Sequence, residues 1–235
     1  MKPFIACLML TSPDGSLHPS RWTKSPDGGR YDFSKICDKV REELHCQAWM
    51  VGRVTMAEMA KGAPHAPEGP HIVARPTNFA NRDAKSFGIA IDRSGAVHYK
   101  GADLFGDHII ALLGKDVPDS YLAELAADGV SYVVAETSDF DVGELLAVVN
   151  REFGIERIVL EGGAATNGAL LASGLVDELN FIVAPALEAR SGTDSVVEFG
   201  TDGPAGKVEL SLIDCQQLGH GMVNLRYAAS KPSNS

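Results

Sequence analysis

The sequence predicts an α/β protein in which a mixed, mostly parallel sheet carries helices on both faces and ends in an antiparallel hairpin. Residues 154–185 have the pattern strand, glycine turn, helix, strand, and residues 48–55 repeat its first part. Residues 207–228 form two alternating, strand-like runs that are joined by Gly219-His220-Gly221. The first two patterns are typical of parallel strands with crossover helices, and the third is typical of a hairpin.

The central stretch is the turn at Gly162-Gly163. A short, mostly apolar run, Arg157–Glu161, predicts a buried strand before it, with Glu161 at the strand end where open α/β sheets place ligands. The glycines let the chain turn sharply and leave room for a ligand. A helix from Ala164 to Ser173 then presents its free N–H groups to an anion such as a pyrophosphate. A tight structural connection would explain the two glycines alone equally well, since the full G-x-G-x-x-G pattern is missing.

A second turn of the same kind follows the strand predicted at Ala48–Val51. Gly52-Arg53-Val54-Thr55 leads that strand into a helix, and Arg53 could meet a phosphate. Two such turns in one chain are more informative than one, and together they indicate a phosphate-bearing ligand.

The remaining elements follow from hydrophobic periodicity and from turn residues. Strands are expected at residues 3–10, 71–75, 88–92, 107–113, 130–135 and 178–184, and helices at residues 32–47, 118–128 and 141–153. Asp141-Val142-Gly143-Glu144 resembles a capping box at the start of the last helix. The polar loop 16–31, with Arg21 and Trp22, is long enough for a binding loop, although a surface excursion would also explain it.

Composition predicts one domain over residues 1–229 and a disordered tail over residues 230–235. The chain has 235 residues, of which 45% are hydrophobic and 22% charged, as is ordinary for a globular protein. A formal net charge of −10 argues against broad binding to nucleic acid or acidic membranes, but not against an anionic cofactor. No apolar run approaches the length of a membrane span.

The four cysteines predict neither a metal site nor a disulfide framework. They form no C-x-x-C pair, and no histidines stand at zinc spacing, so no metal is expected. Cys7 and Cys215 lie in strand-like runs and are expected to be buried thiols, which fits a reducing cytoplasm. His65, beside a loop rich in Pro, Gly and Ala, is expected to be a solvated histidine.

A set of motifs runs in the same order over nearly the whole chain: Ser12-Pro13-Asp14-Gly15, Trp22-Thr23, Arg41, Gly52-Arg53-Val54-Thr55, Val159-Leu160-Glu161-Gly162-Gly163, and Gly174-Leu175-Val176-Asp177-Glu178 before Ala184-Pro185. In these motifs the chain resembles the reductase domain of riboflavin biosynthesis, the C-terminal domain of the bifunctional deaminase-reductase. The pair E-G-G and G-L-V-D-E is the specific part. The resemblance implies a three-layer, dihydrofolate-reductase-like fold.

The resemblance also implies an NADPH-dependent reductase of a ring-opened sugar on 5-amino-6-(5-phosphoribosylamino)uracil. The cofactor would supply the hydride. The residues expected to line NADPH are Gly52, Arg53, Thr55, Gly162, Gly163, Ala164 and Thr166, with Arg93 and Ser94 as candidates for its 2′-phosphate. Asp14, Arg21, Trp22 and Glu161 would face the substrate, with Arg21 as a partner for its phosphate. Asp14 or Glu161 could relay the proton, although Asp14 could equally stabilise its turn and Glu161 orient its loop.

Three departures from the family pattern lie on the substrate side: the segment Pro13 with Ser16-Leu17-His18, the stretch Met56–Met59, and Glu188 in place of a common glycine. Two alternatives therefore stay open. One is a dihydrofolate or pterin reductase, because the fold is shared, and the other is a non-catalytic NADP-binding protein. The zinc deaminase signature, H-x-E with P-C-x-x-C, is absent from the sequence. A homodimer that pairs through the sheet and its C-terminal strands is expected by analogy.

Overall fold

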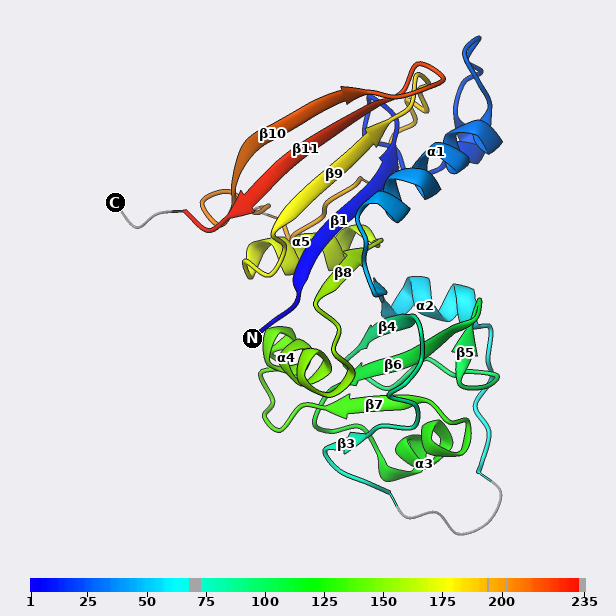
Figure 1. The fold of residues 1–235 in the computed structure, drawn as a ribbon, viewed down its shortest axis with the longest axis vertical. Coiled ribbons are helices and arrows are strands. Elements are labelled where there is room, and N and C mark those ends of the chain that lie inside the picture. Colours follow the sequence, from blue (N-terminus) through cyan, green and yellow to red (C-terminus); the bar gives the residue numbers. More distant parts are fainter. Residues whose placement is uncertain (68–72, 194, 202, 233–235) are drawn as a thin grey trace. The chain divides into compact units, whose positions relative to one another are not determined.

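The computed structural model describes residues 1–67, 73–193, 195–201 and 203–232. It divides into two compact units (Figure 1), one of Met1–Pro3 with Gln47–Ile158 and the other of Phe4–Cys46 with Val159–Ser235. We call them the first and the second unit. The organisation as one domain stays a prediction. In the part of the chain that is described, no helix combines the length and the hydropathy needed to cross a membrane.

The first unit is built on four parallel strands. They are, in spatial order, β2 (Ala48–Gly52), β4 (Phe87–Asp92), β6 (Asp107–Leu113) and β7 (Ser131–Val134). Two short strands pair antiparallel with them, β5 (Asp103–Leu104) with β6 and β3 (Thr77–Asn78) with β7. Helix α2 (Arg53–Ala60) contacts β2 and β4, whereas α3 (Asp119–Ala127) and α4 (Val142–Phe153) contact β7.

Burial on both faces explains why these strands are near-continuous apolar runs. A parallel strand that is covered on both faces has no solvent side, so its residues need not alternate. Ile89, Ile110 and Leu112 are accordingly fully buried. Gly88 lies against the ring of Trp49, where a Cβ would come within 3.0 Å of ring carbons. A larger residue at this position would displace a buried tryptophan.

The second unit holds the N-terminal strand and the C-terminal hairpin. Strand β1 (Phe4–Thr11) pairs parallel with β9 (Glu178–Val183), β11 (Val223–Ser230) pairs antiparallel with β9, and β10 (Glu209–Gln217) pairs antiparallel with β11. The helices of this unit are α1 (Arg30–Glu43) and α5 (Ala164–Ala172), and a 3-10 turn covers Pro19–Arg21. Strand β8 (Arg157–Leu160) straddles the boundary between the units.

The structure confirms the α/β class, the two strand-turn-helix patterns and the hairpin, with element ends shifted by a few residues. One predicted strand was wrong. Val73–Arg75 forms no strand, and the strand here is Thr77–Asn78. Arg75 instead directs its side chain to the carbonyls of residues 115 and 117. The other residues of that expected strand, 71 and 72, lie outside the described residues.

Cys215 is exposed, whereas Cys7 is buried as expected. Strand β10 is the last strand of the described sheet order, and all of its residues are exposed, so an apolar run does not imply burial there. Of the expected disordered tail, Ser230 is instead the last residue of β11. Residues 233–235 lie outside the described part.

Candidate active site

The turn after β8 opens the N-terminus of α5, as the sequence predicted. Gly162 has a φ of 101°, a conformation that L side chains rarely adopt, and the peptide bond that follows it is cis. Gly163 is the residue before the helix and has no side chain with which to cap it. Ala164 and Thr166 lie in the first turn, so their backbone N–H groups are available to an anion.

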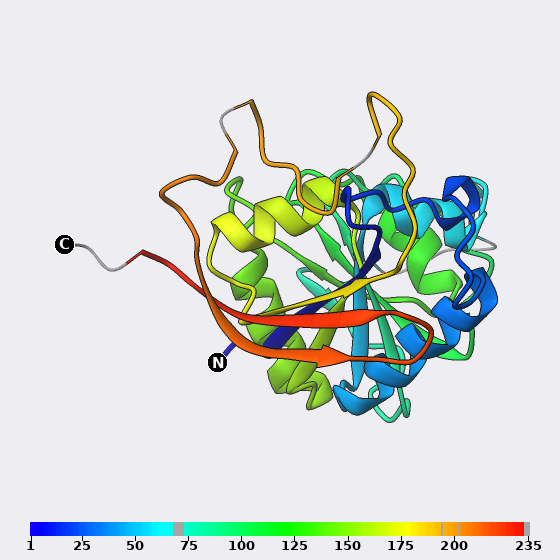
Figure 2. The ribbon, with the colours of Figure 1, turned by 90° about the horizontal axis from the view of Figure 1, so that it is seen from above.

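The chain after β9 runs alongside α5 (Figure 2). The amide of Glu198 donates to the carbonyl of Ala164 at 3.0 Å, and Asn167 Nδ2 donates to the carbonyl of Val196 at 2.9 Å. A Cβ on Gly168 would lie within 3.0 Å of the Glu198 carbonyl. Residues 196–198 therefore hold one side of α5 at a spacing that only glycine permits, and its first turn is fixed in position.

Glu161 forms an ion pair with Arg41 of α1, with Arg41 Nε 3.1 Å from Glu161 Oε1. Burial raises the pKa of the Glu161 carboxyl, Arg41 opposes that rise, and the nearby Asp38 adds to it. Two cysteines beside this carboxylate, Cys7 and Cys37, have thiol pKa values raised to about 12, mainly by burial and next by Glu161. Glu161 is thus a carboxyl that holds a proton more readily than an exposed glutamate does.

Asp14 ties the turn after β1 to the chain after β9. Its carboxylate accepts hydrogen bonds from Ser12 Oγ at 2.6 Å, from the amide of Ala189 at 2.6 Å and from the amide of Glu188 at 3.3 Å. These hydrogen bonds lower the pKa of Asp14, and the bond from Ser12 has the largest effect. Asp14 is therefore a carboxylate whose oxygens are used within the turn.

Two of the departures from the family pattern contact each other. Ser16 Oγ donates to Glu188 Oε2 across 172 positions of sequence and accepts from the indole Nε1 of Trp22 at 3.2 Å. Arg21 Nη1 lies 3.6 Å from Glu188 Oε1, and the Glu188 side chain is 0% exposed. The structure thus places Arg21 and Trp22 around a buried carboxylate that the sequence did not connect with them.

A hollow of about 460 Å³ opens beside this cluster at the start of α1. Trp22 and Phe33 contribute its aromatic lining, with ring centroids 6.5 Å apart, and Lys24 and Arg30 contribute two cations. Sequence reasoning did not select Lys24 or Arg30 as site residues. The available signal was that both residues lie in the same long polar loop, 16–31, as Trp22.

In the first unit the predicted cofactor residues gather at the carboxyl ends of adjacent strands. Gly52 ends β2 opposite Ile91 of β4, and Arg53 and Thr55 lie in the first turn of α2. Arg93 and Ser94 directly follow β4. Because β2 and β4 are parallel, these two groups share one edge of the sheet, where α/β proteins bind ligands.

The turn after β4 is stabilised by the buried side chain of Asp92. Asp92 is fully buried, and its carboxylate accepts from the amides of Ala96 and Val97 at 2.7 and 2.8 Å and from Ser94 Oγ at 3.2 Å. Arg93 Nη2 donates to the carbonyl of Ser138 at 2.9 Å. Arg93 is thus fixed at this edge, with part of its guanidinium already used.

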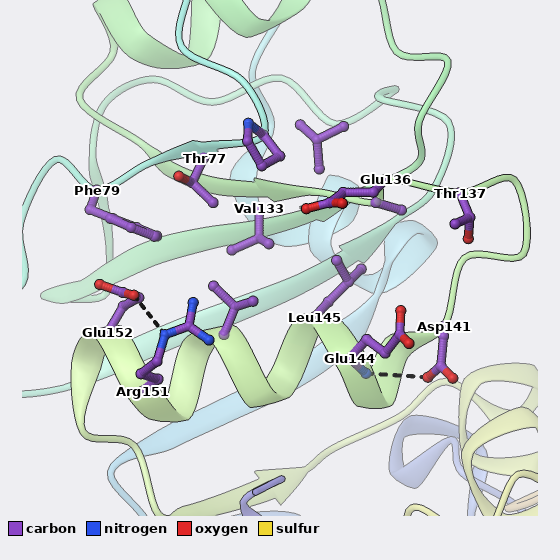
Figure 3. Close-up of a pocket in the computed structure, with 14 residues that line it drawn as sticks. Thr77, Phe79, Val133, Glu136, Thr137, Asp141, Glu144, Leu145, Arg151 and Glu152 are labelled. Carbon is purple, nitrogen blue, oxygen red and sulfur yellow. Dashed lines mark hydrogen bonds and ion pairs between the residues drawn. The ribbon is translucent and has the colours of Figure 1, made fainter.

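The first unit has another cavity, of about 530 Å³, between α4 and the strands β3 and β7 (Figure 3). Val133 and Leu145 lie on its apolar walls, and Glu136 and Glu144 lie on its rim (Figure 3). Asp141 caps α4 here, accepting from the amides of residues 143 and 144. None of the predicted site residues lines this cavity, whose acidic rim does not suit an anionic cofactor.

Comparison with known proteins agrees with these motifs. The family model described as the RibD C-terminal domain matches residues 3–224. The chain is 25% identical over 228 residues to the 2,5-diamino-6-ribosylamino-4(3H)-pyrimidinone 5′-phosphate reductase of Methanothermobacter thermautotrophicus, covering 95% of this chain and 97% of that protein.

Solved structures show the fold. A pyrimidine reductase-like protein from Corynebacterium diphtheriae matches with a TM-score of 0.64 and 19% identity, over 98% of this chain and 93% of its own. RibD from Acinetobacter baumannii matches with a TM-score of 0.62 and 19% identity, over 97% of this chain and 58% of its own. The predicted fold of the riboflavin reductase domain is confirmed.

Proposed function

The chain belongs to the RibD C-terminal domain family, and on that premise we propose that it is an NADPH-dependent reductase of a ribosylaminopyrimidine 5′-phosphate in riboflavin biosynthesis. The observation that carries the proposal is the turn after β8. There a carboxyl with a raised pKa, Glu161, directly precedes the glycines that open the N-terminus of α5. Such a turn can accept a phosphate-bearing cofactor and place a proton donor next to it.

The residues that we assign to NADPH lie at two helix starts and one strand end, and each group could bind a phosphate by itself. The second unit has Gly162, Gly163, Ala164 and Thr166 at the start of α5, where N–H groups would bind a pyrophosphate oxygen. In the first unit, Gly52, Arg53 and Thr55 start α2, and Arg93 with Ser94 would bind the 2′-phosphate that distinguishes NADPH from NADH.

The cofactor supplies the hydride, and the protein must supply a proton to the electronegative atom on the carbon that is reduced. We assign this proton to Glu161, because its raised pKa keeps a larger fraction protonated. Asp14 has a lowered pKa and three hydrogen bonds to its carboxylate. We therefore give Asp14 the task of holding the substrate-side turn rather than donating the proton.

The substrate would lie against Trp22, with its phosphate on the basic side of the hollow at the start of α1. Lys24 and Arg30 line that hollow. Arg21, the predicted phosphate partner, forms an ion pair with Glu188. Of the two pyrimidines in question, the archaeal relative is named for the diaminopyrimidinone, whereas the family resemblance suggested the aminouracil. Both carry the same ribosyl phosphate, so both belong in the test.

One observation favours a second candidate, a non-catalytic NADP-binding protein. The buried carboxylate of Glu188 lies on the substrate side and is paired with the arginine that was expected to hold phosphate. A substrate phosphate at that position would meet an already neutralised partner.

The experiment begins with fluorescence titration of the purified protein with NADPH and NADH. Each pyrimidine phosphate is then added and the loss of NADPH absorbance is followed. Glu161→Gln should retain cofactor binding and lose turnover, whereas Glu156→Gln, an exposed acid before the same strand, should retain both. Binding without turnover of either pyrimidine would favour the second candidate, and no NADPH binding would refute both.

We also propose that the protein forms a homodimer through β10. This strand ends the described sheet order and exposes Leu210, Leu212 and Ile213, with Leu212 60% exposed. A long apolar edge strand invites pairing with another chain, and a second copy would cover it. Sedimentation at micromolar concentration should give a dimer mass that Leu212→Lys reduces to a monomer mass. A monomer mass for the unaltered protein would refute the proposal.

A further inference from the structure

The last turn of α3 concentrates negative charge away from the proposed active site. Glu124 and Asp128 lie four residues apart and so share one face of the helix end. Glu124 is buried, and the last turn of α3 contains no basic residue. Carboxylates at a helix C-terminus face the negative end of the helix dipole, so this pair requires a cation from elsewhere.

His65 reaches this pair from the loop that follows α2. Its Nε2 lies 3.1 Å from Asp128 Oδ1, and its Nδ1 lies 3.5 Å from Glu124 Oε1. Gly62 holds the loop in place, because it lies so close to the backbone of His98 that a Cβ would be within 3.0 Å of it. One ligand atom from each of the three side chains can be chosen so that all lie within 4.8 Å of one another.

Two further observations point to a ligand rather than a simple ion pair. Asp128 Oδ2 is buried and receives no hydrogen bond from any described residue. A buried carboxylate oxygen without a donor is costly, and a metal ion would satisfy it. In addition, His98 Nδ1 lies 2.6 Å from Glu124 Oε1. A hydrogen bond of this kind orients a metal-binding carboxylate from behind.

We propose that His65, Glu124 and Asp128 bind a divalent first-row transition metal ion such as Zn²⁺, with His98 orienting Glu124. One imidazole and two carboxylates form a donor set that zinc accepts, and the fourth position of a tetrahedron is left for water. An imidazole ligand disfavours Mg²⁺ and Ca²⁺, which select oxygen ligands. These ligands show no zinc spacing along the chain, because His65 lies 59 residues before Glu124 and 63 residues before Asp128.

The metal would fasten the loop after α2 onto α3. Because the three ligands are brought together only in the folded chain, metal binding to the folded state adds to its stability. The site lies wholly in the first unit and involves none of the residues assigned to NADPH or substrate. The proposal therefore stands or falls independently of the reductase activity.

The test uses full-length protein that has been stripped of metal by a chelator. Zn²⁺ is titrated by calorimetry, and Co²⁺ is titrated while its visible d–d absorption is followed. We expect a single equivalent of either ion to bind, a rise in Tm with Zn²⁺, and d–d bands of the intensity typical of four-coordinate cobalt. Mg²⁺ at the same concentration should leave the Tm unchanged.

Three variants identify the ligands. His65→Ala and Asp128→Asn, which replace partly exposed side chains, should each weaken Zn²⁺ binding more than about tenfold and abolish the rise in Tm. His45→Ala, which removes an exposed histidine from the second unit, should behave like the unaltered protein. Absence of stoichiometric binding, or equal binding by His65→Ala, would overturn the proposal and leave protonated His65 as the cation of this cluster.

Discussion

Replacement of Arg41 by glutamine should raise the pKa of Glu161 further above the ordinary range of a glutamate. Arg41 is the group that opposes the effects of burial and of Asp38 on this carboxyl. Glutamine removes the positive charge and is shorter than arginine, so the ion pair with Glu161 is lost. The remaining influences on Glu161 then all act in one direction, toward the protonated form.

The size of the effect follows from the ion pair. Opposite charges about 4 Å apart attract by about 1 kcal/mol in water and by about 4 kcal/mol at an effective dielectric constant of about 20. Arg41 is 38% exposed and Glu161 is 29% exposed. Solvent therefore screens the pair, and its energy belongs near the lower end of that range. The variant is therefore expected to lose about 1 kcal/mol of attraction that favours the ionised carboxyl, and the pKa of Glu161 rises accordingly.

The measurement is an NMR titration of side-chain carboxyl carbons in protein labelled at glutamate, with Glu161→Gln to assign the resonance. The matched control is Lys39→Gln, which removes a cation of the same helix that pairs with Glu43 instead. A Glu161 pKa that is unchanged or lower in the Arg41 variant would refute the reasoning. The direction of the Glu161 pKa shift also determines how this group makes the stability of the folded state depend on pH. A raised carboxyl pKa stabilises the folded state at low pH, and this contribution is lost as the pH rises through the folded-state value.

Three further predictions concern the frame around the site. Asp14→Asn should flatten the acid limb of the stability curve, because a lowered pKa supplies stability above pH 4 that is lost as the pH falls through the folded-state value; urea unfolding at a series of pH values measures this. Gly88→Ala should cost about 1–3 kcal/mol by overpacking Trp49, read from tryptophan fluorescence during unfolding, and an unchanged midpoint would contradict the packing argument. Asp141→Ala should cost about 1 kcal/mol by uncapping α4, with Thr137→Ala as a control of no effect in the same assay.

The elements that the sequence predicted well are those defined by neighbouring residues. A β-branched run, two glycines and a stretch of helix formers specify the turn after β8 whatever the rest of the chain does, and the structure has it. The pairing of Arg41 with Glu161 was not predicted as a contact, although the resemblance had named both residues. Helix α1 and the end of β8 meet only in the folded chain, so no local pattern records their distance.

The exposure of individual side chains was predicted less well, because it depends on contacts between segments that are distant in the sequence. The run around Cys215 reads as a buried strand, yet β10 is the last strand in the described order, and its apolar residues face outward. Hydrophobic patterning shows that a strand has an apolar face but not whether a neighbour covers it. His65 is exposed, as expected for a loop histidine, but its pairing with two carboxylates of a distant helix was not predicted.

The departures from the family pattern also bear on whether the substrate side is active. Here Ser16 donates to Glu188, and Arg21 and Trp22 are drawn into the same cluster. The Glu188 side chain is buried, so the cluster would be costly to form unless its charge were compensated, as Arg21 does. Arg21 is thereby paired with Glu188 rather than left to a substrate phosphate, so the loss of NADPH absorbance with each pyrimidine phosphate decides between the reductase and a protein that only binds NADP.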